Sequence, residues 1–353
     1  MRANRQRDEH VVEHAVMALD GPQGAELGED VAHVVLSAMR PTIIVPAMRQ
    51  HWPAVSYENW HDTCDTLHAH SQVLGKVAAR LAPREPQLQH TALRLTARGW
   101  ETAPMPAPDG SGSVVVALDL RVHEAAVEHS DGRAERIALT PDRPVADVTR
   151  GVLAALTAVT GRVEIDLTPQ EVPWKVPLDA DYDHDRYDAG QVADYFAAAT
   201  QAALVLAAFR APYRGRSTPV NAWWGSFDLA VSLFSGRSVD PPSDDFITRN
   251  AGDAQAVEIG WWPGDARYAK AAFFAYAYPA EEGFGNRAIS PPAARWDTGL
   301  GEFILDWDDV RAHPDPQAVA LEFARSAFMH ACVVCAWDAA LAASADSRPP
   351  PVT

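Results

Sequence analysis

Cysteine and basic residues are scarce in this chain. Its 353 residues include three cysteines, too few for the disulfide framework of a secreted protein, so we expect a reducing, cytoplasmic location. The 30 lysines and arginines are outnumbered by 47 aspartates and glutamates, which gives a formal net charge of −17. A surface this acidic repels phosphate backbones and anionic lipids, so the composition argues against nucleic-acid and membrane partners.

Several sequence signatures are also missing. The N-terminus lacks the continuous apolar run of a signal peptide. Neither glycine-rich phosphate loop, G-x-G-x-x-G or G-x-x-x-x-G-K-[ST], is present, nor is the G-x-S-x-G turn of α/β-hydrolases, which disfavours those chemistries. The apolar stretch 326–345 contains His330 and Asp338, so we expect a buried or amphipathic helix there rather than a membrane span.

Apolar residues make up 47% of the chain, enough to bury one large core or two modest ones. Apolar side chains at three- and four-residue steps predict helices over 57–81, 144–161, 191–209 and 316–343. Alternating or β-branched runs predict strands over 91–100, 113–122, 135–140, 162–167, 219–233, 256–264, 270–279 and 301–307. This order predicts an α+β protein with helices packed on antiparallel sheets, in two helix–strands–helix halves. A duplication stays open, because no residue-level repeat is visible.

The composition also divides the chain into three parts. Residues 1–47 are charge-rich, and we expect a poorly ordered extension; our hypothesis is that Met48 is the natural first residue. Residues 48–345 are expected to form a single α+β domain, with halves 48–167 and 191–345 joined by a linker rich in proline and aspartate. Residues 346–353 are expected to be a disordered tail.

Three short motifs match known metal or redox patterns, and each has a simpler interpretation. The His-x-x-Glu-His sequence at residues 10–14 fits an inverted zinc-peptidase motif, but it lies in the expected extension. The alternating aspartates of 179–185 lack the glycine and glutamate of a calcium loop, which favours a solvated acidic turn. Cys332 and Cys335 lie inside a predicted helix rather than at its N-terminus, which favours small buried side chains over a redox or zinc pair.

The sequence WHDTCDTLHAH at 60–70 is a stronger metal candidate. His61, Cys64, Asp65 and His68 fall on one face of the predicted helix, and imidazole, thiolate and carboxylate groups all bind zinc or iron. His61, Asp65 and His68 are therefore candidate ligands for a transition metal. The alternative is a half-buried helix face in which His68 is hydrogen-bonded in the core.

The stretch PVNAWWGSFDLAVSLFSGR at 219–237 alternates in the manner of a strand. Phe227, Leu229, Val231 and Leu233 share one face with Trp223, whereas the other face carries Trp224, Ser226, Asp228 and Ser232. A carboxylate among apolar neighbours must be paired or have a shifted pKa, so Asp228 is a candidate catalytic group. Arg237 is the candidate partner of Asp228, which would make that pair structural instead.

Two further histidines flank predicted strands. His90 precedes one strand, and His123 lies on the same strand face as Asp119 and Arg121. A paired histidine and aspartate can form an oriented base, but the same pattern also occurs on ordinary strand surfaces.

Several motifs in order resemble a family of uncharacterised bacterial proteins, classed as a domain of unknown function. They include DTLHAHSQVLGK, LTARGW, WGSFDLA, GWWPG and GEFILDWDDVR, and the resemblance covers about 52–341. The resembled pattern has histidine where this chain has Asn221, and a Ser-His-Glu triplet where it has Asp253, Ala254 and Gln255. The resemblance brings no reaction with it, and it implies that this chain lacks two imidazoles that similar proteins carry.

Two hypotheses follow from these residues. The first is a small-molecule enzyme in which His68, His90, His123 and Asp228 converge on one cavity as catalytic candidates, with Trp224, Ser226 and Arg237 binding the substrate. A histidine would then act as general base or as metal ligand. The second is a non-catalytic binding or assembly protein that keeps the fold without the histidines replaced by Asn221 and Ala254. The sequence leaves the oligomeric state open.

Overall fold

The structure is a computed structural model, and it describes residues 52–241 and 243–345. The predicted extension 1–47, the motif at 10–14, Met48 and the tail 346–353 lie outside the described residues.

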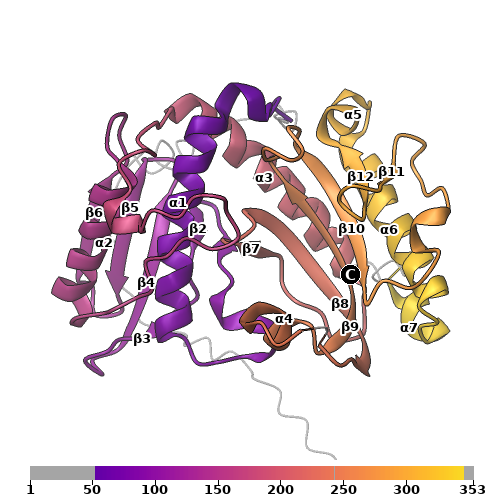
Figure 1. Ribbon diagram of the computed structural model, residues 1–353, viewed down its shortest axis with the longest axis horizontal. Helices are drawn as coiled ribbons and strands as arrows, with labels where there is room; N and C mark the ends of the chain where they lie inside the picture. The colour runs from indigo at the N-terminus through magenta and orange to yellow at the C-terminus, as the bar shows by residue number, and fades with distance from the viewer. Residues whose placement is uncertain (1–51, 242, 346–353) are drawn as a thin grey trace, which may run out of the picture. The chain divides into compact units, whose positions relative to one another are not determined.

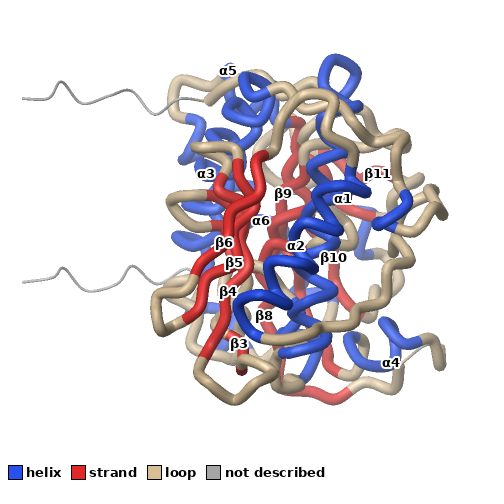
Figure 2. The backbone as a smooth tube through the Cα atoms, turned by 90° about the vertical axis from the view of Figure 1, so that its left-hand side faces the viewer, coloured by secondary structure: helices blue, strands red, loops and turns tan. Residues whose placement is uncertain are grey.

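The first half of the chain forms a sheet covered by helices on one face. Helix α1 (Tyr57–Leu81) leads through the 3-10 helix η2 (Pro86–Thr91) to six short strands and then to α2 (Val145–Thr160). The strands are β1 (Arg94–Leu95), β2 (Gly99–Glu101), β3 (Met105–Pro106), β4 (Ser113–Asp119), β5 (Glu124–His129) and β6 (Ala134–Ala138). They pair antiparallel in the order β1-β2-β4-β5-β6, with β3 beside β4. Helix α1 contacts β4 while α2 contacts β5 and β6 (Figure 2).

The second half repeats the order of helix, six strands and helix. After η3 (Leu178–Ala180), helix α3 (Ala189–Arg210) leads to the second sheet, whose order is β11-β12-β10-β9-β8-β7. Its strands are β7 (Asn221–Trp223), β8 (Asp228–Ser238), β9 (Ala254–Trp262), β10 (Ala272–Tyr278), β11 (Arg295–Asp297) and β12 (Glu302–Asp306). The helices within and after it are α4 (Phe246–Ala251), η4 (Phe284–Asn286), α5 (Trp307–Ala312), α6 (Pro316–Val334) and α7 (Ala339–Ser344) (Figure 1).

These elements confirm the predicted α+β class with two antiparallel sheets. Helix α1 has the predicted bounds, because its apolar positions repeat without interruption. Several predictions were wrong in detail. The strand predicted over 219–233 is two strands, β7 and β8, joined by a turn, and the strand predicted over 91–100 is interrupted between β1 and β2. Residues 162–167 pair with no strand, although Val163 is buried, since alternation reports which side chains are buried and not whether the backbone has a partner. The predicted C-terminal helix is two helices, because Ala336 has a positive φ and Asp338 caps a new start.

The two sheets meet at one bridge and share a core. Leu93, just before β1, exchanges two backbone hydrogen bonds with Ala222 of β7, at 3.0 and 2.9 Å. The main apolar cluster contains buried residues from both halves, among them Trp100 and Phe227, whose rings stack at 5.0 Å. Helix α3 is the one helix in the described part of the chain that is long and apolar enough to cross a membrane, but it packs against β8, β9 and α6 as a core helix.

The second sheet buries one face and leaves the other partly open. Leu229, Val231 and Leu233 of β8 belong to the main core beneath α3 and α6. The opposite side chains of β8, including Asp228 and Ser232, face away from that core. The open face therefore combines polar groups with a small second apolar cluster of Ala230, Trp262, Ala272, Phe274 and Ile304.

Candidate active site

Two connected cavities occupy the open face of the second sheet. The first, of about 380 Å³, lies between the sheet, η2, α4 and residues 170–171 of the linker; we call it the apolar chamber. The second, of about 600 Å³, lies over β8, β9, β10 and β12; we call it the acidic chamber. They share four lining residues: Glu171, Ser226, Glu258 and Tyr276.

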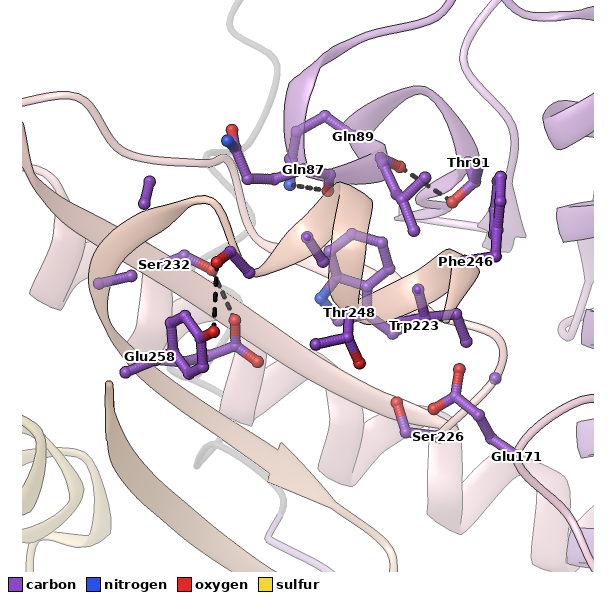
Figure 3. Close-up of a pocket in the computed structure, with 18 of the residues that line it drawn as sticks. Gln87, Gln89, Thr91, Glu171, Trp223, Ser226, Ser232, Phe246, Thr248 and Glu258 are labelled. Carbon is purple, nitrogen blue, oxygen red and sulfur yellow. Dashed lines mark hydrogen bonds between the residues drawn. The ribbon is translucent and has the colours of Figure 1, made fainter. Parts of the chain in front are cut away.

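The apolar chamber is walled mainly by hydrocarbon and aromatic groups. Leu88 of η2, Phe234 of β8, and Phe246 and Ile247 of α4 line it, together with Trp223. At one end Glu171 and Ser226 lie side by side, and elsewhere Glu258 lies beside Ser232 (Figure 3). A ligand entering this chamber would therefore meet apolar walls and a few polar groups, the usual composition of a small-molecule site.

The acidic chamber gathers six carboxyl groups, from Glu171, Asp228, Glu258, Asp265, Asp297 and Glu302, around one guanidinium, Arg267. Arg267 is held by Asp265, with Nη2 donating to Oδ2 at 2.7 Å. In the described part of the chain, no ion pair joins the other five to a lysine or arginine. The chamber is therefore strongly negative whenever these groups are ionised.

Burial and mutual repulsion shift the titration of this cluster upward. Asp228 is 6% exposed, and its burial raises the pKa of its carboxyl well above the ordinary value, reinforced by Glu258, Glu171 and Glu302. Burial also raises the pKa of Glu258, although its carboxyl accepts hydrogen bonds from Ser232 at 2.6 Å and Tyr276 at 2.8 Å. Burial and the nearby Glu258 raise the pKa of Glu302 to about 7. Glu302 is therefore still partly protonated near neutral pH.

Asp228 and Ser226 are brought together by a tight hairpin. Trp223 of β7 pairs with Asp228 of β8, so residues 224–227 form the turn between them. The Ser226 hydroxyl donates to Asp228 Oδ1. The side chain of Phe227 turns into the core, where it stacks on His68 at 4.8 Å and on Tyr195 at 5.3 Å. The turn therefore places an apolar anchor on one side and two polar groups on the other.

Helix α1 positions this turn through one face. His68 Nε2 lies 2.9 Å from the Trp224 carbonyl and 3.0 Å from that of Gly225, so this nitrogen carries the proton and donates. Gly75 lies directly against the Trp224 indole, where a Cβ would overlap the ring. Lys76 places its ammonium 5.4 Å from the centre of the same ring. Spacings of seven and eight residues along a helix bring these three residues to one side of α1.

The same helix face holds the linker. The Gln72 amide donates to the Gln170 carbonyl at 2.9 Å and accepts from the Gln170 backbone N–H at 2.9 Å. The next residue, Glu171, reaches the space over Gly225 that any larger side chain would fill. The linker therefore contributes a carboxyl group to the site as well as joining the two halves.

Several lining residues have an unusual backbone conformation. Gln87, Leu88 and Glu171, which line the apolar chamber, have φ of 50°, 54° and 59°, and Phe227 has φ of 59°. Residues other than glycine rarely adopt positive φ, and such strain gathers at functional sites. Three of the seven such residues in the described part of the chain line the apolar chamber, and a fourth, Phe227, lies in the adjoining turn, which marks this pocket as the candidate site.

The three histidines proposed as catalytic do not share a cavity, so that expectation was wrong. His68 is 9% exposed behind the turn, and burial lowers its pKa to about 4, which keeps it neutral. His90 Nδ1 accepts the Glu85 backbone N–H, and His123 lies beside Tyr187 at a separate shallow cavity. Catalytic roles for His90 and His123 stay predictions. Neither residue lines the apolar or the acidic chamber, so any such role would belong to another part of the protein.

The predicted partner of Asp228 was also wrong. Arg237 donates to the backbone carbonyls of Cys335 and Ala336, beyond α6, and lines neither chamber. Of the three residues predicted to bind substrate, Trp224 and Ser226 do line the apolar chamber.

The candidate metal ligands separate in the structure. His61 contacts Asp62 and the Glu58 carbonyl, Asp65 accepts from Tyr57, and His68 donates to the turn. Among the described residues no group of three or more His, Cys, Asp or Glu side chains is placed to hold a metal ion. The three cysteines are free and buried, and burial is what the helix interpretation expected of Cys332 and Cys335.

The aspartate-rich linker is more ordered than a solvated turn. Asp181 is buried and accepts the backbone N–H groups of Asp183 and His184, while His184 Nδ1 lies 2.7 Å from its other oxygen. The expected solvated acidic turn was therefore wrong at this residue.

The two positions where the resembled pattern has histidine both lie at the apolar chamber. Ala254 lines it directly. Asn221 is buried beneath it, where Arg94 donates to its side-chain oxygen and its amide donates to Gln89 Oε1 at 2.8 Å. Histidines at these positions would thus stand at the wall or floor of the same pocket.

Of the six carboxyl groups of the acidic chamber, only Asp228 was selected from the sequence, and the other five were missed. Glu258 and Glu302 each sit in an apolar strand, AVEIGWW and EFILD, so the reasoning that selected Asp228 could have selected them too. Glu171 had no such signal, since it lies in an irregular linker and reaches the pocket only through the docking of Gln170.

Comparison with known protein families matches residues 52–344 to a family described as a family of unknown function (DUF5996). Comparisons with curated proteins and with solved structures found no match.

Proposed function

Because the chain belongs to DUF5996, a family of unknown function, its activity must be inferred from the site, and we propose a small-molecule enzyme that transfers protons through buried carboxyl groups. This proposal keeps the predicted small-molecule enzyme. It assigns the acid–base role to Asp228 and its neighbours instead of to histidine. We also propose that the enzyme works in the cytoplasm, where three free cysteines remain reduced.

The observation that carries the proposal is the setting of Asp228. Its carboxyl group is buried, faces the acidic chamber, and has Ser226 as its one side-chain hydrogen-bond partner in the described part of the chain. A buried carboxyl group with a raised pKa keeps its proton to a higher pH than a free one, so it can donate that proton to a bound substrate as a general acid.

Neighbouring groups supply the remaining functions. Glu302, whose pKa is raised to about 7, can accept a proton near neutral pH. Glu258 is held in orientation by Ser232 and Tyr276, so it suits the binding of a substrate donor. Carboxyl groups in unlike environments within one cavity are the arrangement expected for separate acid and base roles.

The experiment is a ligand screen followed by a search for conversion. Compounds that raise the melting temperature would be incubated with the protein and followed by NMR. We expect at least one to be converted, and Asp228→Asn to lower its rate by about a hundredfold, the usual effect of losing a general acid. Asp309→Asn, an exposed aspartate on α5, is the matched control and should leave the rate unchanged.

A non-catalytic binding protein is the second candidate, favoured by Asn221 and Ala254, which stand at this chamber where the resembled sequence pattern has histidine. It predicts compounds that bind in the pocket and are never converted. If the wild-type protein binds compounds in the pocket but converts none of them, the proposed enzyme activity is contradicted.

A further inference from the structure

We propose that the ligand of this pocket is an organic ammonium ion with an apolar group, its charged head in the acidic chamber and its apolar part in the other. This inference rests on the proposed function only in placing the ligand in the same pocket, and it names the ligand's chemical class.

The first argument is the junction between the chambers. Glu171, Ser226, Glu258 and Tyr276 line both, so one molecule can extend from one chamber into the other past these residues. All four carry side-chain oxygen atoms at the point where a polar head would join an apolar chain. The combined cavity therefore has an apolar end and an acidic end, with polar residues at the junction between them.

The second argument concerns the head group. Within the acidic chamber only Arg267 carries a positive charge, and Asp265 already neutralises it. Asp228 of β8, Glu258 of β9 and Glu302 of β12 line the same chamber, with β10 lying between β9 and β12. A carboxylate or phosphate ligand would be repelled by this set, whereas an ammonium ion would replace the missing counter-charge.

The third argument is the aromatic wall around the carboxyl groups. Trp262 packs against Tyr268 and Phe274 with ring centres 5.5 and 5.6 Å apart, and Phe274 stacks on Tyr276 at 6.2 Å. All four line the acidic chamber. Aromatic faces attract organic cations, and rings combined with carboxylates form the usual setting for ammonium groups in proteins.

The fourth argument concerns the apolar part. Phe246 and Ile247 of α4 are among the large apolar side chains that remain exposed, at 58% and 37%, and both line the apolar chamber. Covering them with a ligand's hydrocarbon would remove apolar surface from water. A bare inorganic cation would leave this chamber empty.

The raised pKa values of the carboxyl groups predict that ammonium binding is linked to proton release. The pKa of Glu302, which faces Glu258, Arg267 and Asp297, is raised to about 7, and burial also raises the pKa of the Asp228 and Glu171 carboxyl groups. An entering ammonium ion favours the ionised forms, so binding releases protons and strengthens as the pH rises.

The test is isothermal titration with four probes. Benzylammonium, benzyl alcohol and benzoate share one ring and differ in charge, while methylammonium has the charge without the ring. We expect benzylammonium to bind at least tenfold more tightly than benzyl alcohol or methylammonium, and benzoate to bind least. Its affinity should rise at least threefold from pH 6 to pH 8, with proton release measured in buffers of different ionisation enthalpy.

Variants test which chamber binds the ammonium head and which binds the apolar group. Glu302→Gln should weaken the binding of benzylammonium at least fivefold at pH 8 and leave the binding of benzyl alcohol unchanged. Phe246→Ala should weaken the binding of both compounds. Glu282→Gln, exposed outside both chambers, is the control. Benzyl alcohol or benzoate binding as tightly as benzylammonium, or no measurable benzylammonium binding, would overturn the inference. Neither result bears on turnover, so the inference and the proposed enzyme can fail separately.

Discussion

At the scale of single residues, Gly75 of α1 lies directly against the indole ring of Trp224. The indole ring lies where a Cβ at position 75 would stand, and its Nε1 donates to the Thr91 carbonyl at 3.1 Å. We expect Gly75→Ala to lower the free energy of unfolding by about 1–3 kcal/mol, since overpacking a rigid ring costs more than the helix propensity that alanine gains.

Chemical denaturation checks this prediction. Gly190→Ala is the control, because its nearest neighbour is an exposed Asp188 carboxylate oxygen, and it should change stability by less than about 0.5 kcal/mol. Equal effects of the two substitutions would contradict the close contact.

His68 gives a prediction about pH. Its buried ring must stay neutral, and burial lowers its pKa from 6.5 to about 4. Between these values the unfolded chain binds more protons, so this contribution to stability is present above pH 6.5 and is lost as the pH falls toward 4. We expect His68→Phe, which keeps the ring stacking, to cost about 1–3 kcal/mol at pH 7 because two buried carbonyls lose their donor.

The stability difference between wild type and His68→Phe should shrink between pH 6.5 and pH 4, as measured by urea denaturation. His70, whose pKa is lowered to about 3, remains in both proteins and cancels in the comparison. A difference that does not change with pH would mean that His68 is not held neutral by its surroundings.

At the scale of elements, Gln72 joins α1 to the linker through both ends of one amide. A glutamate at this position could still accept from the Gln170 N–H but would face the Gln170 carbonyl with an oxygen. We expect Gln72→Glu to release residues 168–176 and to displace Glu171 from the pocket, with faster amide exchange at Gln170 and earlier proteolysis in this segment.

Gln317→Glu, in the first turn of α6, is the control for the same chemical change. Unaltered exchange at Gln170 in Gln72→Glu would show that the linker is held by other contacts.

The elements also show how far the sequence could predict this fold and site. Local periodicity was sufficient for α1, and alternation was sufficient to put Asp228 and Ser232 on one face. The turn at 224–227 was not anticipated, because an apolar run through Trp224 and Phe227 hides the change of direction. Glu171 and the separation of His90 from His123 depend on contacts between distant segments, which no local pattern records.

At the scale of the whole molecule, the shared core predicts one cooperative unit. Trp60 of α1 stacks on Tyr195 of α3 at 5.1 Å, and Trp100 of the first sheet stacks on Phe227 of the second hairpin. Because the halves bury side chains against each other, neither should retain its core alone. We expect a single calorimetric transition whose van't Hoff and calorimetric enthalpies agree.

Two separated transitions would instead indicate halves that unfold independently. Expression of residues 49–167 alone offers a second check, and we expect that fragment to be unfolded by circular dichroism and proteolysis.

The tryptophans that line the two chambers give the protein an intrinsic fluorescence signal for ligand binding. Of the eleven in the chain, Trp223 and Trp224 line the apolar chamber and Trp262 lines the acidic one, while Trp100, Trp261 and Trp307 lie fully enclosed elsewhere. The enclosed indoles supply a steady background of emission. Any molecule that occupies the pocket alters the polarity around the other three, so their fluorescence would register its arrival without an attached dye.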